Sequence, residues 1–212
     1  MPSALAVVLA YVIGSIPTAY LAGRWLKGVD LRTVGSGNLG ATNVHRNLGV
    51  RAAVVVLVLD FLKGGLPAAL LPRFFHADVG GGANTTLWLG LACGVAAIAG
   101  HAKPVFLLWR GGGKGVATAA GVFAALAPTA FGVAFASFAV TFALTRIVSA
   151  ASISAAIAMP VGMALTAGAR SPLFIVSVVV SAFVLWAHRS NMARLRQGTE
   201  PRFGARTTEG SR

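Results

Sequence analysis

The chain has 212 residues, of which 56% are hydrophobic and only 11% are charged. Because a soluble domain carries about 25% charged residues, this composition excludes an ordinary soluble protein and indicates an integral membrane protein. The net charge of +13 would suggest nucleic-acid binding in a polar chain. In a chain this apolar, however, we expect the basic residues in short loops that set membrane orientation, and we expect no nucleic-acid partner.

Seven apolar segments meet or approach the ~20 residues that a membrane-spanning helix needs. They cover residues 3–23, 52–72, 85–102, 115–128, 130–145, 147–167 and 172–187. The first has no basic region before it, so we expect a retained helix and not a signal peptide. The fourth and fifth are short and Pro128 lies between them. One long helix kinked at this proline is the alternative.

The basic residues between these segments orient the chain. With seven spans, 15 Lys and Arg residues fall on one side of the membrane and only Arg73 and Arg170 on the other, while Lys63 lies inside the second span. Because cytoplasmic loops carry the excess of positive charge, we expect the N-terminus outside and the C-terminus in the cytoplasm. The expected fold is an all-α membrane protein with seven transmembrane helices. A single domain would cover 1–203, followed by a polar tail over 204–212.

Three polar clusters interrupt the apolar pattern, and this topology places all of them at the cytoplasmic face. They cover residues 35–46, 100–115 and 188–196. Glycines leave backbone N–H groups accessible to an anion, and the triple glycine before Lys114 also opens a helix, whose N-terminus favours negative charge. The pattern predicts a site for phosphate groups. It is not a nucleotide-binding P-loop, because the GxxxxGK[ST] spacing is absent.

Individual side chains in these clusters fit the same chemistry. Arg46 and Arg110 can each hold an oxyanion through two N–H groups. His188 and Asn191, at i and i+3, would share one face if the helix continues. Ser149, at the cytoplasmic start of the sixth span, can line the same site.

Two charged residues, Asp60 and Lys63, lie within the second span, where isolated charges are costly. Their i, i+3 spacing fits an ion pair that supports the fold, with contact to the site as the alternative. The sequence leaves open whether His101 and His188 act on a substrate or only end their helices. Cys93 is the single cysteine and the four histidines are dispersed, so we expect neither a metal site nor a cofactor.

Together the three clusters resemble the signatures of the bacterial membrane acyltransferases that use acyl-phosphate to acylate glycerol 3-phosphate. The family patterns GSGNxGATN, GHxxPVFxxFKGGKGVAT and HRxNxxRLxxGxE correspond to residues 35–43, 100–118 and 188–200. There are two departures from the pattern. One more glycine precedes Lys114, which puts its register in question, and Lys103 replaces an aromatic residue.

The resemblance implies a seven-helix protein of the bacterial inner membrane with its active site at the cytoplasmic face. It would transfer an acyl group to the sn-1 hydroxyl of glycerol 3-phosphate, giving lysophosphatidic acid and inorganic phosphate, the first acylation in phospholipid synthesis. Since acyl-phosphate has a good leaving group, positioning the two anions would supply most of the catalysis. The implied partners are acyl-phosphate, glycerol 3-phosphate, the lipid bilayer and, as a further candidate, the enzyme that makes the donor.

The resemblance also implies roles for particular residues. The catalytic residues would be Ser36, Lys114, His188 and Asn191. The substrate-binding residues would be Gly35, Gly37, Asn38, Gly40, Thr42, Asn43, Arg46, His101, Arg110, Gly111, Gly112, Gly113 and Ser149. The general base would be His188 or a phosphate of the substrate.

Two other classes of protein are alternatives. A membrane transporter of a small organic phosphate would show similar glycine-broken helices, but it needs polar residues at mid-membrane and access from both faces. A non-catalytic protein that binds anionic lipids through a basic face would need neither the glycine loops nor the pair of His188 and Asn191. Polar clusters confined to one face favour the enzyme.

Overall fold

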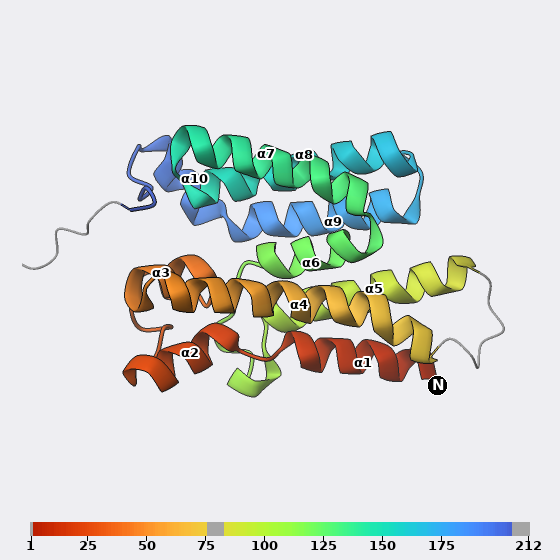
Figure 1. Ribbon diagram of the computed structural model, residues 1–212, viewed down its shortest axis with the longest axis horizontal. Helices are drawn as coiled ribbons and strands as arrows, with labels where there is room; N and C mark the ends of the chain where they lie inside the picture. The colour runs from red at the N-terminus through yellow and green to blue at the C-terminus, as the bar shows by residue number, and fades with distance from the viewer. Residues whose placement is uncertain (1, 76–82, 205–212) are drawn as a thin grey trace, which may run out of the picture.

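The computed structural model describes residues 2–75 and 83–204, and every regular element in these two ranges is helical (Figure 1). The elements are α1 (Pro2–Gly14), α2 (Thr18–Lys27), α3 (Ala41–Leu48), α4 (Val50–Phe75), α5 (Ala83–Ala102), η1 (Val105–Leu107), α6 (Val116–Leu126), α7 (Pro128–Thr145), α8 (Val148–Ala167), α9 (Pro172–Ala187) and α10 (Arg189–Arg196). The long helices follow the long axis of the molecule. In this view α7, α8 and α9 form one layer, α1, α4 and α5 another, and α6 lies between them.

Five helical stretches are long and apolar enough to cross a membrane. They are Pro2–Lys27, Val50–Phe75, Asn84–Leu107, Pro128–Thr145 and Val148–Ala167. A sixth is added if α9 and α10, which are bent by 58° at their junction, count as one span. Each expected segment falls on a helix, but α6 has only 11 residues. At 1.5 Å per residue it is about 16 Å long, short of the ~30 Å hydrocarbon core.

The first expected helix, 3–23, is broken in the structure. α1 ends and α2 begins after Pro17, because a proline has no N–H to donate and disfavours a helical conformation at the residue before it. The carbonyl oxygen of that residue, Ile16, accepts a hydrogen bond from Lys63 Nζ at 2.9 Å. The expectation of one continuous helix is therefore wrong, and a charge on α4 satisfies part of the backbone that the break exposes.

The turn expected at Pro128 is present. α6 ends at Leu126, α7 begins at Pro128, and Ala127 between them has a φ of −150°. The chain reverses its direction here (Figure 1). A proline suits the first position of a helix, where the N–H has no partner in any case. The alternative of one long kinked helix is wrong.

Glycines let α4 and α6 cross in close contact. A Cβ added at Gly64 would lie 2.2 Å from the carbonyl oxygen of Thr118, and one added at Gly121 would lie 1.9 Å from that of Phe61. Small residues at membrane-helix crossings allow the dispersion contacts that hold such helices together. This crossing also fixes the N-terminal end of α6, where the loop carrying Lys114 arrives.

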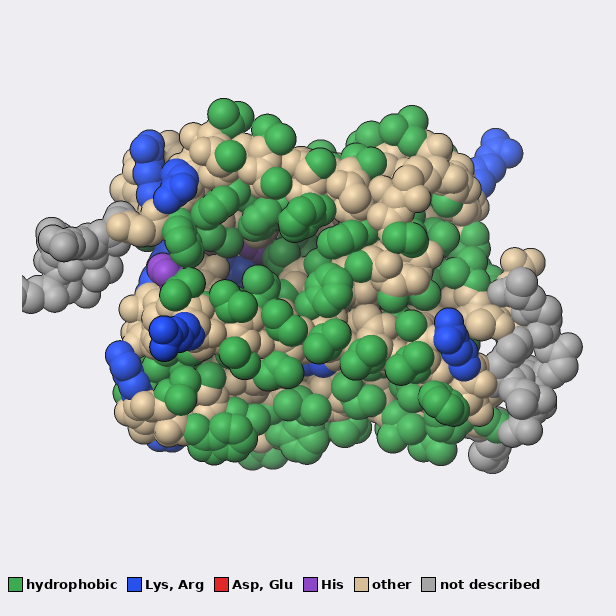
Figure 2. Space-filling view, viewed as in Figure 1, with side chains coloured by type: hydrophobic (Ala, Val, Ile, Leu, Met, Phe, Trp, Pro, Cys, Tyr) green, Lys and Arg blue, Asp and Glu red, His purple; other side chains and the backbone are tan. Residues whose placement is uncertain are grey.

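The outer surface is apolar along most of its length. Figure 2 shows hydrophobic side chains over the middle of the molecule, with Lys and Arg mostly near its two ends. Leu144 and Leu165 are 80% and 79% exposed, a state that suits contact with lipid and not with water. The surface therefore agrees with the membrane protein that the composition predicts.

Gly121→Ala is expected to weaken the α4–α6 crossing, because its new methyl group would meet the carbonyl oxygen of Phe61. Overpacking of this kind costs about 1–3 kcal/mol, so the melting temperature of the detergent-solubilised protein should fall by several degrees. Gly132→Ala in α7 is the matched control, since a Cβ there meets nothing within 4 Å. Equal melting temperatures for the two variants would contradict the importance of the crossing.

Candidate functional site

The three polar clusters meet at one end of the helical layers, where α2, α3 and α10 lie (Figure 1). We call residues 28–40 the first loop, residues 108–115 the glycine loop and residues 197–204 the C-terminal segment. The first loop joins the glycine loop through Leu39 N and Gly112 O, 3.2 Å apart. The glycine loop joins the third cluster through Lys114 Nζ, which donates to Asn191 Oδ1.

Asn43 organises the first loop from inside. Its side chain is 2% exposed, and Oδ1 accepts the N–H of Ser36 at 3.1 Å. Nδ2 donates to the carbonyl oxygens of Leu31 and Val34 at 3.1 and 3.2 Å. Because the amide is used within the loop, Asn43 holds the loop in shape and leaves the Ser36 side chain exposed.

Two glycines of the first loop allow backbone conformations with positive φ. Gly35 and Gly37 have φ values of +61° and +67°, which only glycine adopts at little cost. Asn38 Nδ2 reaches the carbonyl oxygen of Gly112 at 3.3 Å. Gly40 caps α3 and Thr42 lies half-buried in its first turn. The loop is thus tied to its neighbour before any ligand binds.

The glycine loop packs tightly on the end of α5. A Cβ at Gly112 would lie 2.0 Å from the carbonyl oxygen of Ala102, and one at Gly113 would lie 1.9 Å from His101 Nε2. The His101 side chain is 5% exposed. The structure therefore places His101 beneath the loop, as its support.

The charges inside the second span form the expected ion pair. Lys63 Nζ lies 2.8 Å from Asp60 Oδ1, which also accepts a hydrogen bond from Thr18 Oγ1 at 2.6 Å. His101 Nδ1 lies 3.6 Å from the same oxygen. The pair thus connects α4 with the start of α2 and, through His101, with the glycine loop.

Glu200 gathers the third cluster around one buried carboxylate. Oε1 accepts hydrogen bonds from Ser149 Oγ at 2.7 Å and from Asn191 Nδ2 at 2.6 Å, and Oε2 accepts one from Arg194 Nε at 2.6 Å. Burial would raise the pKa of Glu200, but these hydrogen bonds outweigh it and hold the pKa below its usual value. The residue therefore stays ionised and ties α8 to α10.

Lys114 is the cation at the centre of the site. Burial lowers the pKa of its ammonium group to about 8; the charges of Arg194 and Arg46 act in the same direction and that of Glu200 opposes them. Since Lys114 Nζ donates to Asn191 Oδ1, the Asn191 amide lies between this cation and the Glu200 carboxylate. An anion beside Lys114 would favour its charged form.

His188 lies where α9 and α10 meet, and the helix expected to continue through it is bent by 58°. Its side chain is 3% exposed, and Nδ1 lies 2.8 Å from the carbonyl oxygen of Val184. In the neutral ring Nδ1 then carries the proton and Nε2 is an acceptor. His188 and Asn191 are both buried despite the bend.

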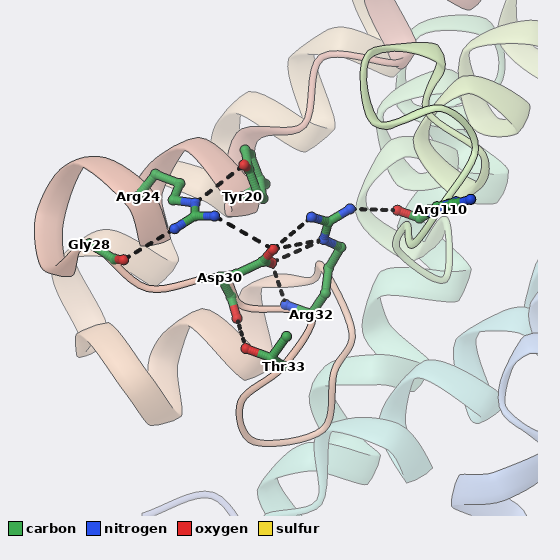
Figure 3. A network of polar contacts seen from close by, with 7 residues as sticks. All are labelled: Tyr20, Arg24, Gly28, Asp30, Arg32, Thr33 and Arg110. Atoms are coloured by element: carbon green, nitrogen blue, oxygen red, sulfur yellow. Dashed lines mark hydrogen bonds and ion pairs between the residues drawn. The ribbon is translucent and has the colours of Figure 1, made fainter.

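The two arginines expected to hold oxyanions differ in their position. Arg46 lies close enough to Lys114 for its charge to lower the pKa of that group. Arg110 is exposed, and its carbonyl oxygen accepts a hydrogen bond from Arg32 Nη1 at 3.3 Å (Figure 3). Both side chains are exposed; the charge of Arg46 reaches Lys114, and the structure shows no such effect of Arg110.

The C-terminal segment folds back over the site. Phe203 stacks on His45 with ring centroids 4.3 Å apart, and its N–H donates to the carbonyl oxygen of Arg146 at 2.6 Å. Beside this segment, Figure 2 shows a hollow between the layers with histidine and Lys or Arg side chains at its bottom and hydrophobic side chains on its rim. The arrangement can hold small anions below and an apolar chain at the rim.

Sequence reasoning missed two residues of the site, Glu200 and Arg194. Both lie in the third motif, and Glu200 is one of only five acidic residues in the chain. That scarcity is a signal, because a carboxylate among cationic groups is expected to accept hydrogen bonds from them or from neighbouring donors. Nothing in the pattern, however, shows that residue 200 returns to contact Ser149.

Comparisons with known proteins agree with one another. Residues 4–198 match the family described as glycerol-3-phosphate acyltransferase. A glycerol-3-phosphate acyltransferase of Synechococcus sp. (strain CC9902) is 50% identical over 204 residues, which cover 96% of each chain. One of Parasynechococcus marenigrum (strain WH8102) is 46% identical over 200 residues, covering 94% of this chain and 89% of the other.

Two solved structures have the same fold. Both are crystal structures of PlsY (YgiH), an integral membrane glycerol 3-phosphate acyltransferase. Its glycerol 3-phosphate form has a TM-score of 0.84 and 40% identity, and its lysophosphatidic acid form has a TM-score of 0.80 and 39% identity. In both cases the match covers 96% of each chain.

Glu200→Ala is expected to lower the free energy of unfolding by about 3 kcal/mol, because it leaves buried donors of Ser149 and Asn191 without an acceptor. Thermal unfolding in detergent measures this, with the exposed Gln197→Ala as control. Since the folded-state pKa of Glu200 lies below its unfolded value, its contribution is present above about pH 4.3 and is lost as the pH falls through the folded-state pKa. The difference between wild type and variant should shrink there; a constant difference would exclude an ionised Glu200.

Proposed function

The chain belongs to the glycerol-3-phosphate acyltransferase family, and we propose that it transfers the acyl group of acyl-phosphate to the sn-1 hydroxyl of glycerol 3-phosphate. The products are lysophosphatidic acid and inorganic phosphate. The observation that carries this proposal is the half-buried Lys114 beside a loop of three glycines at one end of an apolar protein. Crystal structures of a relative with glycerol 3-phosphate and with lysophosphatidic acid support it. Membership of this family disfavours the transporter and the lipid-binding protein.

The main task of this site is to bring two anions together. Lys114 and Arg46 supply positive charge, and the Ser36 hydroxyl and the N–H groups of Gly111 and Gly112 supply hydrogen-bond donors, whereas the N–H of Gly113 donates to the carbonyl oxygen of His101. Such preorganised donors are worth most where water is excluded. The positive charges offset the repulsion between the two phosphorylated substrates, and holding the substrates in contact removes the entropy cost of their encounter.

The reaction needs no covalent enzyme intermediate. The sn-1 oxygen attacks the carbonyl carbon of acyl-phosphate, a new C–O ester bond forms, and the bond to the phosphate oxygen breaks with its electron pair leaving on phosphate. The hydroxyl proton passes to His188 Nε2, an acceptor in the neutral ring, or to a phosphate oxygen. The Val184 carbonyl that receives Nδ1–H fixes the tautomer that this role requires.

Asn191 has a supporting role in this proposal. Its Oδ1 accepts from Lys114 and its Nδ2 donates to Glu200, so the amide is used on both sides. It therefore aims the ammonium group, while Ser149 is held by the same carboxylate at the edge of the site. Apolar side chains at the rim of the hollow in Figure 2 would receive the acyl chain.

We place the protein in the bacterial inner membrane with seven crossings, the N-terminus outside, and the C-terminus and active site at the cytoplasmic face. α6, although short, runs opposite to both α5 and α7, and the two ends of the described chain lie at opposite ends of the long axis (Figure 1). Both observations support an odd number of crossings. Residues 1–203 would form the single domain; of the proposed tail over 204–212, residues 205–212 lie outside the described residues. An enzyme that produces acyl-phosphate would bind at the cytoplasmic face, where most of the Lys and Arg residues would lie.

Lys114→Ala is expected to lower activity at least about 100-fold, since a lost anion-stabilising donor costs about 3 kcal/mol in the transition state. Purified protein in detergent would be given acyl-phosphate and glycerol 3-phosphate, and inorganic phosphate and acylated product would be measured. Arg51→Ala, which removes an exposed charge outside the site, is the control. Wild-type protein that forms no product would refute the proposed reaction, and an active Lys114→Ala would move the role to Arg110 or Lys103.

Labelling of single cysteines tests the proposed orientation. In a Cys93→Ala background, Arg170→Cys should react with a membrane-impermeant maleimide in spheroplasts, whereas Arg189→Cys should react only after the membrane is opened. Both positions are exposed in the structure, so access depends on the membrane alone. The opposite pattern would invert the orientation, and labelling of both from outside would rule out an odd number of crossings between Arg170 and Arg189.

A further inference from the structure

Arg32 connects the first loop with the glycine loop but has no place in the reaction described above. It lies between α2 and α3, and its guanidinium group faces Asp30, the ring of Tyr20 and the backbone of Arg110 (Figure 3). Nη1 donates to the Arg110 carbonyl oxygen at 3.3 Å, and Cζ lies 5.1 Å from the centre of the Tyr20 ring. One side chain thus reaches from the first loop to the residue that precedes the triple glycine.

Asp30 fixes the direction of this side chain. Arg32 Nε lies 3.0 and 3.1 Å from the two carboxylate oxygens and Nη2 lies 2.6 Å from Oδ2, while the main-chain N–H of Arg32 also donates to Oδ1 at 3.0 Å. The hydrogen bonds from Arg32 hold the pKa of Asp30 below its usual value. Because the carboxylate neutralises the guanidinium group and occupies its fork, Arg32 is not a phosphate ligand.

Glycines of both loops pack closely against Arg32. A Cβ at Gly111 would lie 2.8 Å from Arg32 Cδ, and one at Gly37 would lie 3.1 Å from the Arg32 carbonyl oxygen. Gly111 has a φ of +88°, a backbone conformation that favours glycine, so this position has no side chain of its own to hold it in place. The contacts of Arg32 with Gly111 and with the Arg110 carbonyl oxygen therefore restrict the position of this backbone, which a glycine side chain cannot do.

We propose that Arg32 is a positioning residue for the acyltransferase reaction, which holds the glycine loop in register with the first loop so that both can bind phosphate. The inference rests on the proposed function, because the loops need this register only if they act on one pair of substrates. The charge of Arg32 is neutralised by Asp30. Its effect on the reaction therefore passes through the backbone of residues 110–113.

Arg32→Gln is expected to raise the KM for one of the two phosphorylated substrates, the one held by the glycine loop, by about tenfold. The KM for the other substrate and kcat should change by less than about threefold, and the melting temperature should change little. Arg32→Lys can pair with Asp30 but cannot at the same time reach the Arg110 carbonyl oxygen, so it should recover stability more completely than KM.

Arg24→Gln is the matched control. Arg24 also faces Asp30, at 3.9 Å, and bonds to Tyr20 and to the carbonyl oxygen of Gly28, but it does not contact the glycine loop. Its KM values should equal those of the wild type. If Arg32→Gln is too unstable to assay, Arg32→Lys decides by the same comparison of the two KM values.

Several outcomes would overturn the inference. One is a KM unchanged in both Arg32 variants. Another is an equal rise in both KM values, or a fall in kcat and melting temperature with neither KM changed, which would make Arg32 a general stabiliser. A rise in KM of the same size in Arg24→Gln would assign the effect to the charge around Asp30. These results all require an active wild type, so they are distinct from failure of the proposed reaction itself.

Discussion

The ion pair between Lys63 and Asp60 is the interaction on which the rest of this structure depends. A charge in the apolar layer is costly unless it is paired and hydrogen-bonded, and here the pair is satisfied by groups on other elements. Lys63 binds the carbonyl oxygen at the break between α1 and α2, and Asp60 receives Thr18 and faces His101. The pair thus connects α4 with the start of α2 and with His101 at the end of α5, which lies beneath the glycine loop.

Many polar groups of the site are hydrogen-bonded to one another in the absence of a ligand. Asn43 and Arg32 shape the two loops, and Glu200 holds Ser149 and Asn191 in place. Preorganisation of this kind is what electrostatic catalysis requires, because donors that need no rearrangement cost nothing at the moment of reaction. Few groups are left to touch the substrate, and most of the polar residues support those few.

The sequence predicts the class of the fold better than it predicts the contacts of single residues. Hydropathy locates the long helices because lipid demands a continuous apolar stretch. It misses the break at Pro17, since the bond from Lys63 that satisfies Ile16 comes from a distant part of the chain. The glycine-rich patterns predict anion binding, but they do not show that Asn43 and His101 lie beneath the loops. Such roles depend on contacts between elements far apart in the sequence, which no local pattern contains.

The segment that carries Glu200 and Phe203 has a consequence for how the protein is made. Its contacts reach Ser149 on α8 and His45 on α3, and it follows every described helix in the chain. During synthesis, therefore, the helices can enter the bilayer one after another while the site still lacks its central carboxylate. Catalytic competence arises in a separate, later step of assembly, after insertion is complete. Until residue 200 has been made, the Ser149 hydroxyl and the Asn191 amide lack the carboxylate that accepts their hydrogen bonds.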